Sequence, residues 1–77
     1  MTQFVPDYRR IAEDIRAQIR DGRLAPGAQL PTRGELIVAY SVSGGTIDAA
    51  LLVLKTEGWL RGHQGRGVYV ADTPPTG

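Results

Sequence analysis

The sequence predicts a mainly α-helical fold that ends in a small two-stranded β-hairpin. Hydrophobic residues recur at helical spacing in three segments, and a β-prone segment follows a glycine-rich turn near the end of the chain. With 77 residues, of which 42% are hydrophobic, the chain can bury one small core. We therefore expect a single domain over residues 1–72 and a flexible tail or linker start over residues 73–77, where two prolines stand.

The first helix is expected over residues 7–21. Pro6 is favourable at a helix start, and Asp21-Gly22 provides a stop. One face of the segment is apolar and the remaining positions are mostly charged; the apolar residues are Tyr8, Ile11, Ala12, Ile15 and Ile19. This pattern predicts a surface helix that turns one side to the core.

A turn and a second helix are expected next. The Pro-Gly pair at 26–27 is a strong turn signal, and residues 28–30 can form a very short strand. Thr32 and Glu35 have the spacing of a capping box, in which each residue binds the backbone N–H of the other. This spacing predicts a helix over residues 33–40.

The third helix is expected over residues 43–57. Ser43 can act as its N-cap, and Gly58 supplies the flexible residue at which a helix commonly stops. Its apolar face consists of Ile47, Ala50, Leu51 and Leu54. Because about three residues separate it from the second helix, the two helices have the helix-turn-helix arrangement.

A hairpin completes the fold. Residues 59–63 and 68–71 are the expected strands, and the glycine-rich segment Gln64-Gly65-Arg66-Gly67 is the turn between them. Trp59 is expected to anchor the hairpin onto the helices. Three helices plus a two-stranded wing make a winged helix-turn-helix.

The composition excludes several classes of function. Nine Lys and Arg residues stand against eight Asp and Glu residues, and the formal net charge of +1 gives no bulk attraction to nucleic acid or membranes. There is no cysteine, and the single histidine, His63, has no second metal ligand at suitable spacing. We therefore expect no catalytic residues, no metal site and no cofactor.

No run is long enough to cross a bilayer, so we expect a cytoplasmic protein without a membrane partner.

A set of short motifs follows the chain from Pro6 to Ala71. They are Pro6-Asp7-Tyr8, Gly22-x-Leu24-x-Pro26-Gly27-x-x-Leu30-Pro31-Thr32, Glu35-Leu36, Tyr40-x-Val42-Ser43, Thr46-Ile47, Glu57-Gly58 and Gly65-Arg66-Gly67-Val68-Tyr69-Val70. With these motifs in this order, the chain resembles the N-terminal DNA-binding domain of GntR-type bacterial transcription regulators. The Pro-x-Tyr opening is most similar to the branch whose members carry a larger metabolite-sensing domain, and no such effector domain follows here.

The resemblance implies a transcription regulator, expected to be a repressor, that binds a pseudo-palindromic operator in double-stranded DNA as a dimer. It implies that the helix over residues 43–57 enters the major groove and that the wing over residues 63–67 enters the minor groove. Three customary arginines are absent. Where relatives usually have arginine this chain has Gly44 and Asp48, and where they commonly read Glu-Arg it has Arg33-Gly34.

The first turns of the third helix hold five candidate DNA-contacting residues. Bare amides at a helix start bind phosphate, and Thr46 can add a hydroxyl contact to phosphate or a methyl contact to thymine. Asp48 can accept a hydrogen bond from cytosine N4, or it can simply stabilise the helix start. The candidates here are Ser43, Gly44, Gly45, Thr46 and Asp48.

The remaining candidates belong to the second helix and the wing. Thr32 and Arg33 can contact phosphate, although Thr32 can also be a cap only. An arginine and a glutamine on a glycine hairpin suit a narrow minor groove, and the wing candidates are His63, Gln64, Gly65 and Arg66. The alternative for the wing is an ordinary exposed hairpin, and for the helix start a junction that binds no ligand.

Two other functions stay open at this point. The chain can be a winged-helix module for protein interaction or dimerisation whose DNA binding is weakened. It can also be the isolated DNA-binding domain of a longer metabolite-sensing regulator, in which Pro74-Pro75 begins the linker. No small-molecule effector is evident from the sequence.

Overall fold

The computed structural model describes residues 7–63 and 67–75. In these ranges the elements are α1 (Asp7–Arg20), α2 (Arg33–Tyr40), α3 (Gly44–Glu57), β1 (Leu60–His63) and β2 (Gly67–Val70). The predicted fold class, a winged helix-turn-helix of three helices and a two-stranded wing, is confirmed. Some ends differ by one residue from the prediction: α1 ends at 20 rather than 21, α3 begins at 44 rather than 43, β1 begins at 60 rather than 59, and β2 covers 67–70 rather than 68–71.

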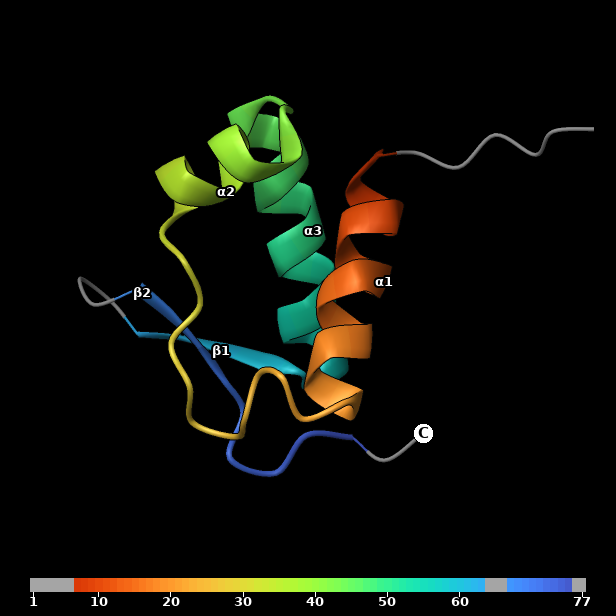
Figure 1. The fold of residues 1–77 in the computed structure, drawn as a ribbon, viewed down its shortest axis with the longest axis vertical. Coiled ribbons are helices and arrows are strands. Elements are labelled where there is room, and N and C mark those ends of the chain that lie inside the picture. Colours follow the sequence, from red (N-terminus) through yellow and green to blue (C-terminus); the bar gives the residue numbers. More distant parts are fainter. Residues whose placement is uncertain (1–6, 64–66, 76–77) are drawn as a thin grey trace, which may run out of the picture.

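The other two helices, α1 and α2, both pack against α3. α1 packs along α3, and α2 lies across the first turns of α3 (Figure 1). The hairpin starts beyond the far end of α3 and runs back toward the α2 side (Figure 1). The helix-turn-helix and the wing therefore end on the same side of the molecule.

One hydrophobic core joins all of these elements. The predicted apolar faces of the first and third helices are the buried ones, and Tyr8 is half-buried against the core. The buried residues are Ile11, Ala12, Ile15, Ile19, Leu30, Leu36, Ile47, Ala50, Leu51, Leu54, Trp59, Leu60 and Val70. Because both the hairpin and the loop before α2 contribute to it, the core fixes the wing to the helices.

The very short strand predicted over residues 28–30 is present as a single antiparallel bridge to β2. The Leu30 N–H donates to the Val68 carbonyl over 2.8 Å, and the Val70 N–H donates to the Ala28 carbonyl over 2.8 Å. β1 pairs with β2 on the other side, from Leu60 opposite Val70 to His63 opposite Gly67. β2 is therefore paired along both of its edges.

Trp59 anchors the hairpin, as the sequence predicts. Its side chain is buried, and the guanidinium carbons of Arg16 and Arg20 lie 6.0 and 5.7 Å from the centroid of its ring. Arg16 also donates from Nη2 to Glu57 Oε1 over 2.9 Å, which ties α1 to the end of α3. This cluster closes the core at the end where the hairpin begins.

Each end of α2 is fixed by local hydrogen bonds. The predicted capping box is confirmed: the Glu35 N–H donates to Thr32 Oγ1 over 3.1 Å, and the Thr32 N–H donates to Glu35 Oε1 over 2.7 Å. At the other end, Ser41 ends the helix in the left-handed conformation with φ 55° and ψ 48°. That conformation brings a side chain too close to the following carbonyl, so it is costly for any residue with a Cβ.

We expect Ser41→Gly to raise the free energy of unfolding by about 0.5–1 kcal/mol, because glycine adopts this conformation without the steric cost. Part of the gain is offset by the greater freedom of glycine in the unfolded chain. Urea denaturation followed by circular dichroism measures the change. Ser41→Ala is the control, since alanine keeps the Cβ. An equal gain in both variants would contradict the explanation.

Tyr40 connects the end of α2 to α1. Its hydroxyl donates to Asp14 Oδ2 over 2.6 Å. Burial raises the pKa of Tyr40 to about 12, and the hydrogen bond to Asp14 and the charge of that carboxylate act in the same direction. The phenol therefore stays neutral in the folded protein at a pH where it ionises in the unfolded chain.

The Tyr40 phenol makes a contribution to stability that depends on pH. Since its pKa is raised from 10.0 to about 12 in the folded state, this contribution is complete below pH 10 and is lost as the pH rises to about 12. We expect Tyr40→Phe to cost about 1 kcal/mol at neutral pH through the lost hydrogen bond. The difference between wild type and variant in urea midpoints should shrink between about pH 10 and pH 12. A constant difference over that range would contradict the assignment.

Candidate nucleic-acid interface

The helix-turn-helix presents the beginnings of two helices on one exposed surface. α2 and α3 enclose a bend of 111°, within the range of about 90–120° found in helix-turn-helix motifs. Only residues 41–43 separate the helices. The chain therefore brings the N-terminus of α2, with Thr32 and Arg33, close to the first turns of α3.

The three candidate hydroxyls act as caps or bind to a cap. Thr32 belongs to the capping box of α2, and Ser43 Oγ accepts from the Thr46 N–H over 3.3 Å. Ser43 Oγ and Thr46 Oγ1 also lie 3.1 Å apart in a hydrogen bond. Ser43 is confirmed as the N-cap of α3. Each hydroxyl oxygen retains lone-pair capacity for a further bond, so capping and a ligand contact are compatible.

Arg33 and Asp48 form an ion pair between the two helices. Arg33 Nε–H donates to Asp48 Oδ1 over 2.7 Å, and Nη2–H donates to Oδ2 over 3.1 Å. The hydrogen bond from Arg33 is the largest cause that lowers the pKa of Asp48, and the hydrogen bond to Asp48 raises the pKa of Arg33. Both side chains are more than half exposed, at 56% and 58%. Both side chains of the pair are therefore charged, and both are accessible to a ligand.

The two glycines at the start of α3 differ in their surroundings. A Cβ on Gly45 would meet no atom within 4 Å, so the backbone there is open to approach. A Cβ on Gly44 would collide with the guanidinium of Arg33, whose Cζ would lie 3.0 Å away. At Gly44 the guanidinium of Arg33 occupies the space that a Cβ would take, and the contact of its backbone amide with DNA stays a prediction.

The wing candidates lie largely outside the described residues. Gln64, Gly65 and Arg66 are not among them, and for His63 the structure describes only the backbone, at the end of β1. The strands that carry the turn are described, and they extend from the core toward the α2 side (Figure 1). These four residues remain candidates from sequence alone.

Lys55 is a cation near this surface that the sequence reasoning missed. Its Nζ lies 3.1 Å from the position that a Cβ would take on Gly62, so the side chain extends over β1. Its charge also contributes to the lowered pKa of Asp48. Lys55 follows Asp48 by seven residues, or about two helical turns, and this spacing was the signal available in the sequence.

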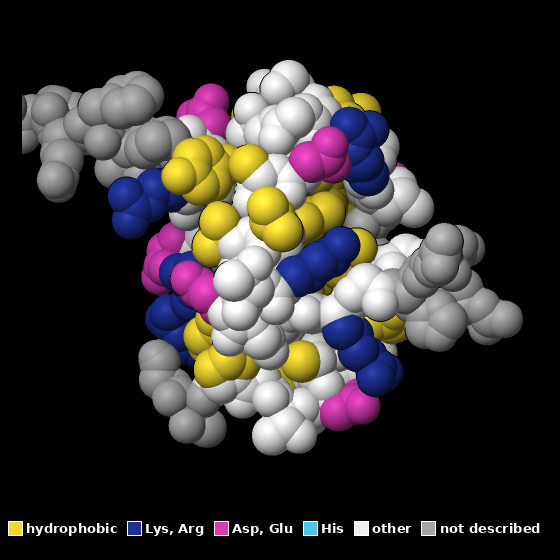
Figure 2. All heavy atoms as spheres, turned by 180° about the vertical axis from the view of Figure 1, so that it is seen from behind, with side chains coloured by type: hydrophobic (Ala, Val, Ile, Leu, Met, Phe, Trp, Pro, Cys, Tyr) yellow, Lys and Arg dark blue, Asp and Glu magenta, His cyan; other side chains and the backbone are white. Residues whose placement is uncertain are grey.

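On one face of the molecule, charged side chains of both signs are mixed (Figure 2). On the face opposite to that of Figure 1, basic, acidic and hydrophobic side chains lie among one another (Figure 2). Two large hydrophobic side chains are strongly exposed, Val38 at 78% and Leu52 at 64%. This face therefore presents no broad basic field to a partner (Figure 2), and individual contacts have to supply recognition there.

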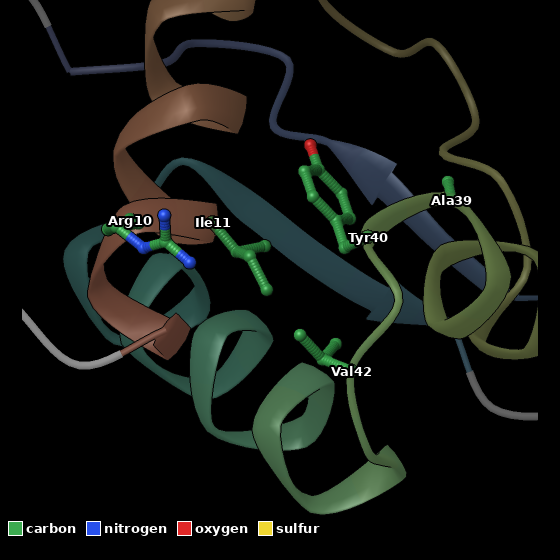
Figure 3. A pocket seen from close by; sticks show the side chains of 5 residues that line it. All are labelled: Arg10, Ile11, Ala39, Tyr40 and Val42. Carbon is green, nitrogen blue, oxygen red and sulfur yellow. The ribbon is translucent and has the colours of Figure 1, made fainter.

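A hollow of about 350 Å³ lies between α1 and the turn from α2 to α3, lined by Arg10, Ile11, Ala39, Tyr40 and Val42. Its floor is apolar, through Ile11 and Val42, and the Tyr40 hydroxyl points away from them (Figure 3). The lining provides no acid–base pair for catalysis. In residues 7–63 and 67–75, no three His, Cys, Asp or Glu residues form a group that could hold a metal ion.

In the described part of the chain, no single helix is long and apolar enough to cross a membrane. α2 and α3 reach that length and composition only when taken together across their 111° bend.

Comparisons with known proteins agree with this geometry. The model of the family described as "Bacterial regulatory proteins, gntR family" matches residues 7–70. Among curated proteins, the chain is 43% identical over 68 residues to the HTH-type transcriptional regulator Rv0792c of Mycobacterium tuberculosis, covering 88% of this chain and 25% of that protein. It is also 43% identical over 67 residues to the mannosyl-D-glycerate transport/metabolism system repressor MngR of Escherichia coli, covering 87% and 28%. The chain thus spans about a quarter of the length of these relatives.

A solved structure with the same fold contains DNA. The DNA-binding domain of AraR in complex with operator ORR3 is similar with a TM-score of 0.88 and 34% sequence identity, over 92% of this chain and 86% of that one. The family match over residues 7–70 spans the helix-turn-helix and both strands of the wing.

Proposed function

The chain belongs to the GntR family of bacterial regulatory proteins and carries the winged helix-turn-helix of its DNA-binding domains. We therefore propose that it is a sequence-specific regulator that represses transcription by binding an operator in double-stranded DNA. The observation that carries the proposal is the likeness to an AraR domain that binds an operator. We assign the DNA-binding domain to residues 1–72 and a linker start to residues 73–77. We place the protein in the cytoplasm, without enzymatic activity.

In this proposal, α3 enters the major groove with its first turn and the wing over residues 63–67 enters the adjacent minor groove. Ser43, Gly45 and Thr46 contact the DNA from the exposed start of α3, where backbone amides and a hydroxyl meet phosphates or base edges. Thr32 lies at the start of α2 and contacts a phosphate of the neighbouring DNA backbone. The wing residues His63, Gln64, Gly65 and Arg66 supply minor-groove contacts.

We further propose that two copies bind a pseudo-palindromic operator. A small domain with a net charge of +1 gains little from the general attraction of DNA, and two specific half-sites double the number of specific contacts. The chain covers about a quarter of its relatives, so a natural protein that continues into a sensing domain fits the same proposal.

Two features of the surface favour a second function, in protein interaction. The Arg33 charge is neutralised by Asp48, and the exposed Val38 and Leu52 offer apolar contact area. A protein-interaction or dimerisation module with weakened DNA binding is therefore the alternative.

Selection of binding sites from a library of random duplexes distinguishes the two functions. The regulator should enrich one motif with two inverted half-sites, and sedimentation of the complex should give two chains for each duplex. A motif without symmetry would contradict the dimer. Failure to enrich any motif would contradict sequence-specific binding and leave the interaction module as the better account.

A further inference from the structure

The Arg33–Asp48 pair leaves one edge of the guanidinium unused. Asp48 binds the side edge formed by Nε and Nη2. A guanidinium has five N–H donors, so three remain, and no described residue of the chain accepts from them. Two of the three point outward in parallel from Nη1 and Nη2. This outer edge is a second fork that can bind two acceptors at once.

Gly44 is what allows the guanidinium to lie in this position. Cζ of Arg33 would be 3.0 Å and Nη1 3.4 Å from a Cβ on residue 44, and Nη2 would be closer than any real contact permits. Any other residue at this position would push the guanidinium away from the start of α3. Asp48 and Gly44 thus fix the guanidinium from two sides, one by hydrogen bonds and the other by leaving space.

We propose that Arg33 reads a guanine in the operator, with its outer fork donating to O6 and N7, and that Asp48 and Gly44 are the positioning residues that aim it. The inference rests on the proposed DNA-binding function and deepens it. It gives three residues of the chain one shared role in specificity.

The charge of the pair favours a base over a phosphate. Because Asp48 cancels the charge of Arg33, the pair gains little from the phosphate backbone, whose attraction depends on net positive charge. Its directed N–H donors remain, and the major-groove edge of guanine presents two acceptors at matching spacing. Adenine presents N7 together with an N6 amino donor, which would oppose one of the two N–H groups. An arginine that is ordered before binding also loses less side-chain freedom on contact.

The test uses the duplex enriched by the wild-type chain, with each guanine replaced in turn by 7-deazaguanine, which lacks the N7 acceptor. For the wild type we expect a loss of affinity of about 10-fold at one guanine in each half-site. Gly44→Ala should remove this sensitivity, because the added methyl displaces the guanidinium without changing any charge. The control is Gly34→Ala, one residue from Arg33, where a Cβ would meet no atom within 4 Å. It should retain the full 10-fold sensitivity.

Asp48→Asn provides a second, independent variant. It keeps the shape of the side chain and removes the charge that neutralises Arg33. We expect the sensitivity to 7-deazaguanine to fall while binding to scrambled duplex strengthens, with the dependence of log affinity on log salt steeper by about one. A purely structural role for Asp48 would change the melting temperature and leave both readouts as in the wild type.

The possible outcomes distinguish failure of this inference from failure of the proposed DNA-binding function. If the wild type binds its enriched duplex specifically but no guanine responds to 7-deazaguanine, Arg33 does not read guanine and the inference is overturned. Sensitivity that survives in both Gly44→Ala and Asp48→Asn overturns the positioning roles. A wild type that shows no specific binding overturns the proposed function, and the inference with it.

Discussion

Gly45→Glu is expected to lower the affinity for the enriched operator on the order of 100-fold, because a carboxylate in the first turn of α3 would face the phosphates. The fold should tolerate it. A Cβ on Gly45 would meet no atom within 4 Å, and a negative charge near a helix N-terminus is favourable. Fluorescence anisotropy with labelled operator measures the loss, and thermal melting verifies that the variant is folded.

Thr56→Glu is the matched control for this prediction. It introduces the same charge change on the same helix at another exposed position. The two sites are eleven residues apart, or about 16 Å along the helix axis. A general effect of net charge would weaken binding equally in both variants. The proposed orientation requires the loss at Gly45 to be at least about tenfold larger than the loss at Thr56.

Leu54→Ala has the largest expected effect on stability. Leu54 is fully buried in the core that joins α1, α3 and the hairpin. Removing a buried leucine side chain costs about 2–5 kcal/mol, since both transfer energy and packing are lost. In a chain of 77 residues, this is a large fraction of the total free energy of unfolding. We expect a strongly lowered urea midpoint, measured by Trp59 fluorescence, and a partly unfolded population at 37 °C.

Leu52→Ala makes the same chemical change two residues away on α3, where the side chain is 64% exposed. Its cost should remain within about 0.5 kcal/mol. Similar losses of stability in the two variants would contradict the assignment of Leu54 to the buried face of α3 and Leu52 to its exposed face.

The architecture could be read from local patterns. The capping box of Thr32 and Glu35, the Ser43 cap and the Gly58 stop each depend on residues close together in sequence. The bounds of α2 and the end of α3 are therefore as predicted, and α3 begins at Gly44, one residue after the predicted start at its cap Ser43. In the hairpin, β1 starts one residue later than predicted and β2 lies one residue earlier, because the strand ends depend on pairing with residues 28–30 as well as on the turn.

The candidate site was only partly predictable. Arg33 and Asp48 were identified separately, but their pairing depends on how α2 crosses α3, which no spacing in the sequence reveals. For the same reason Gly44 was interpreted as bare backbone for a phosphate, although its open space is filled by a side chain from the other helix. Asp48 was considered as an acceptor for cytosine N4 or as a charge that stabilises the helix start, and in the folded protein its carboxylate is paired with Arg33.

Titration of the chain against its enriched operator and a scrambled duplex, at salt concentrations from about 50 to 200 mM, tests the central claim most directly. We predict a linear fall of log affinity with log salt for both duplexes, and a preference for the operator of about a thousandfold or more. Equal affinity for the two duplexes, or binding to neither at the lowest salt, would contradict sequence-specific DNA binding.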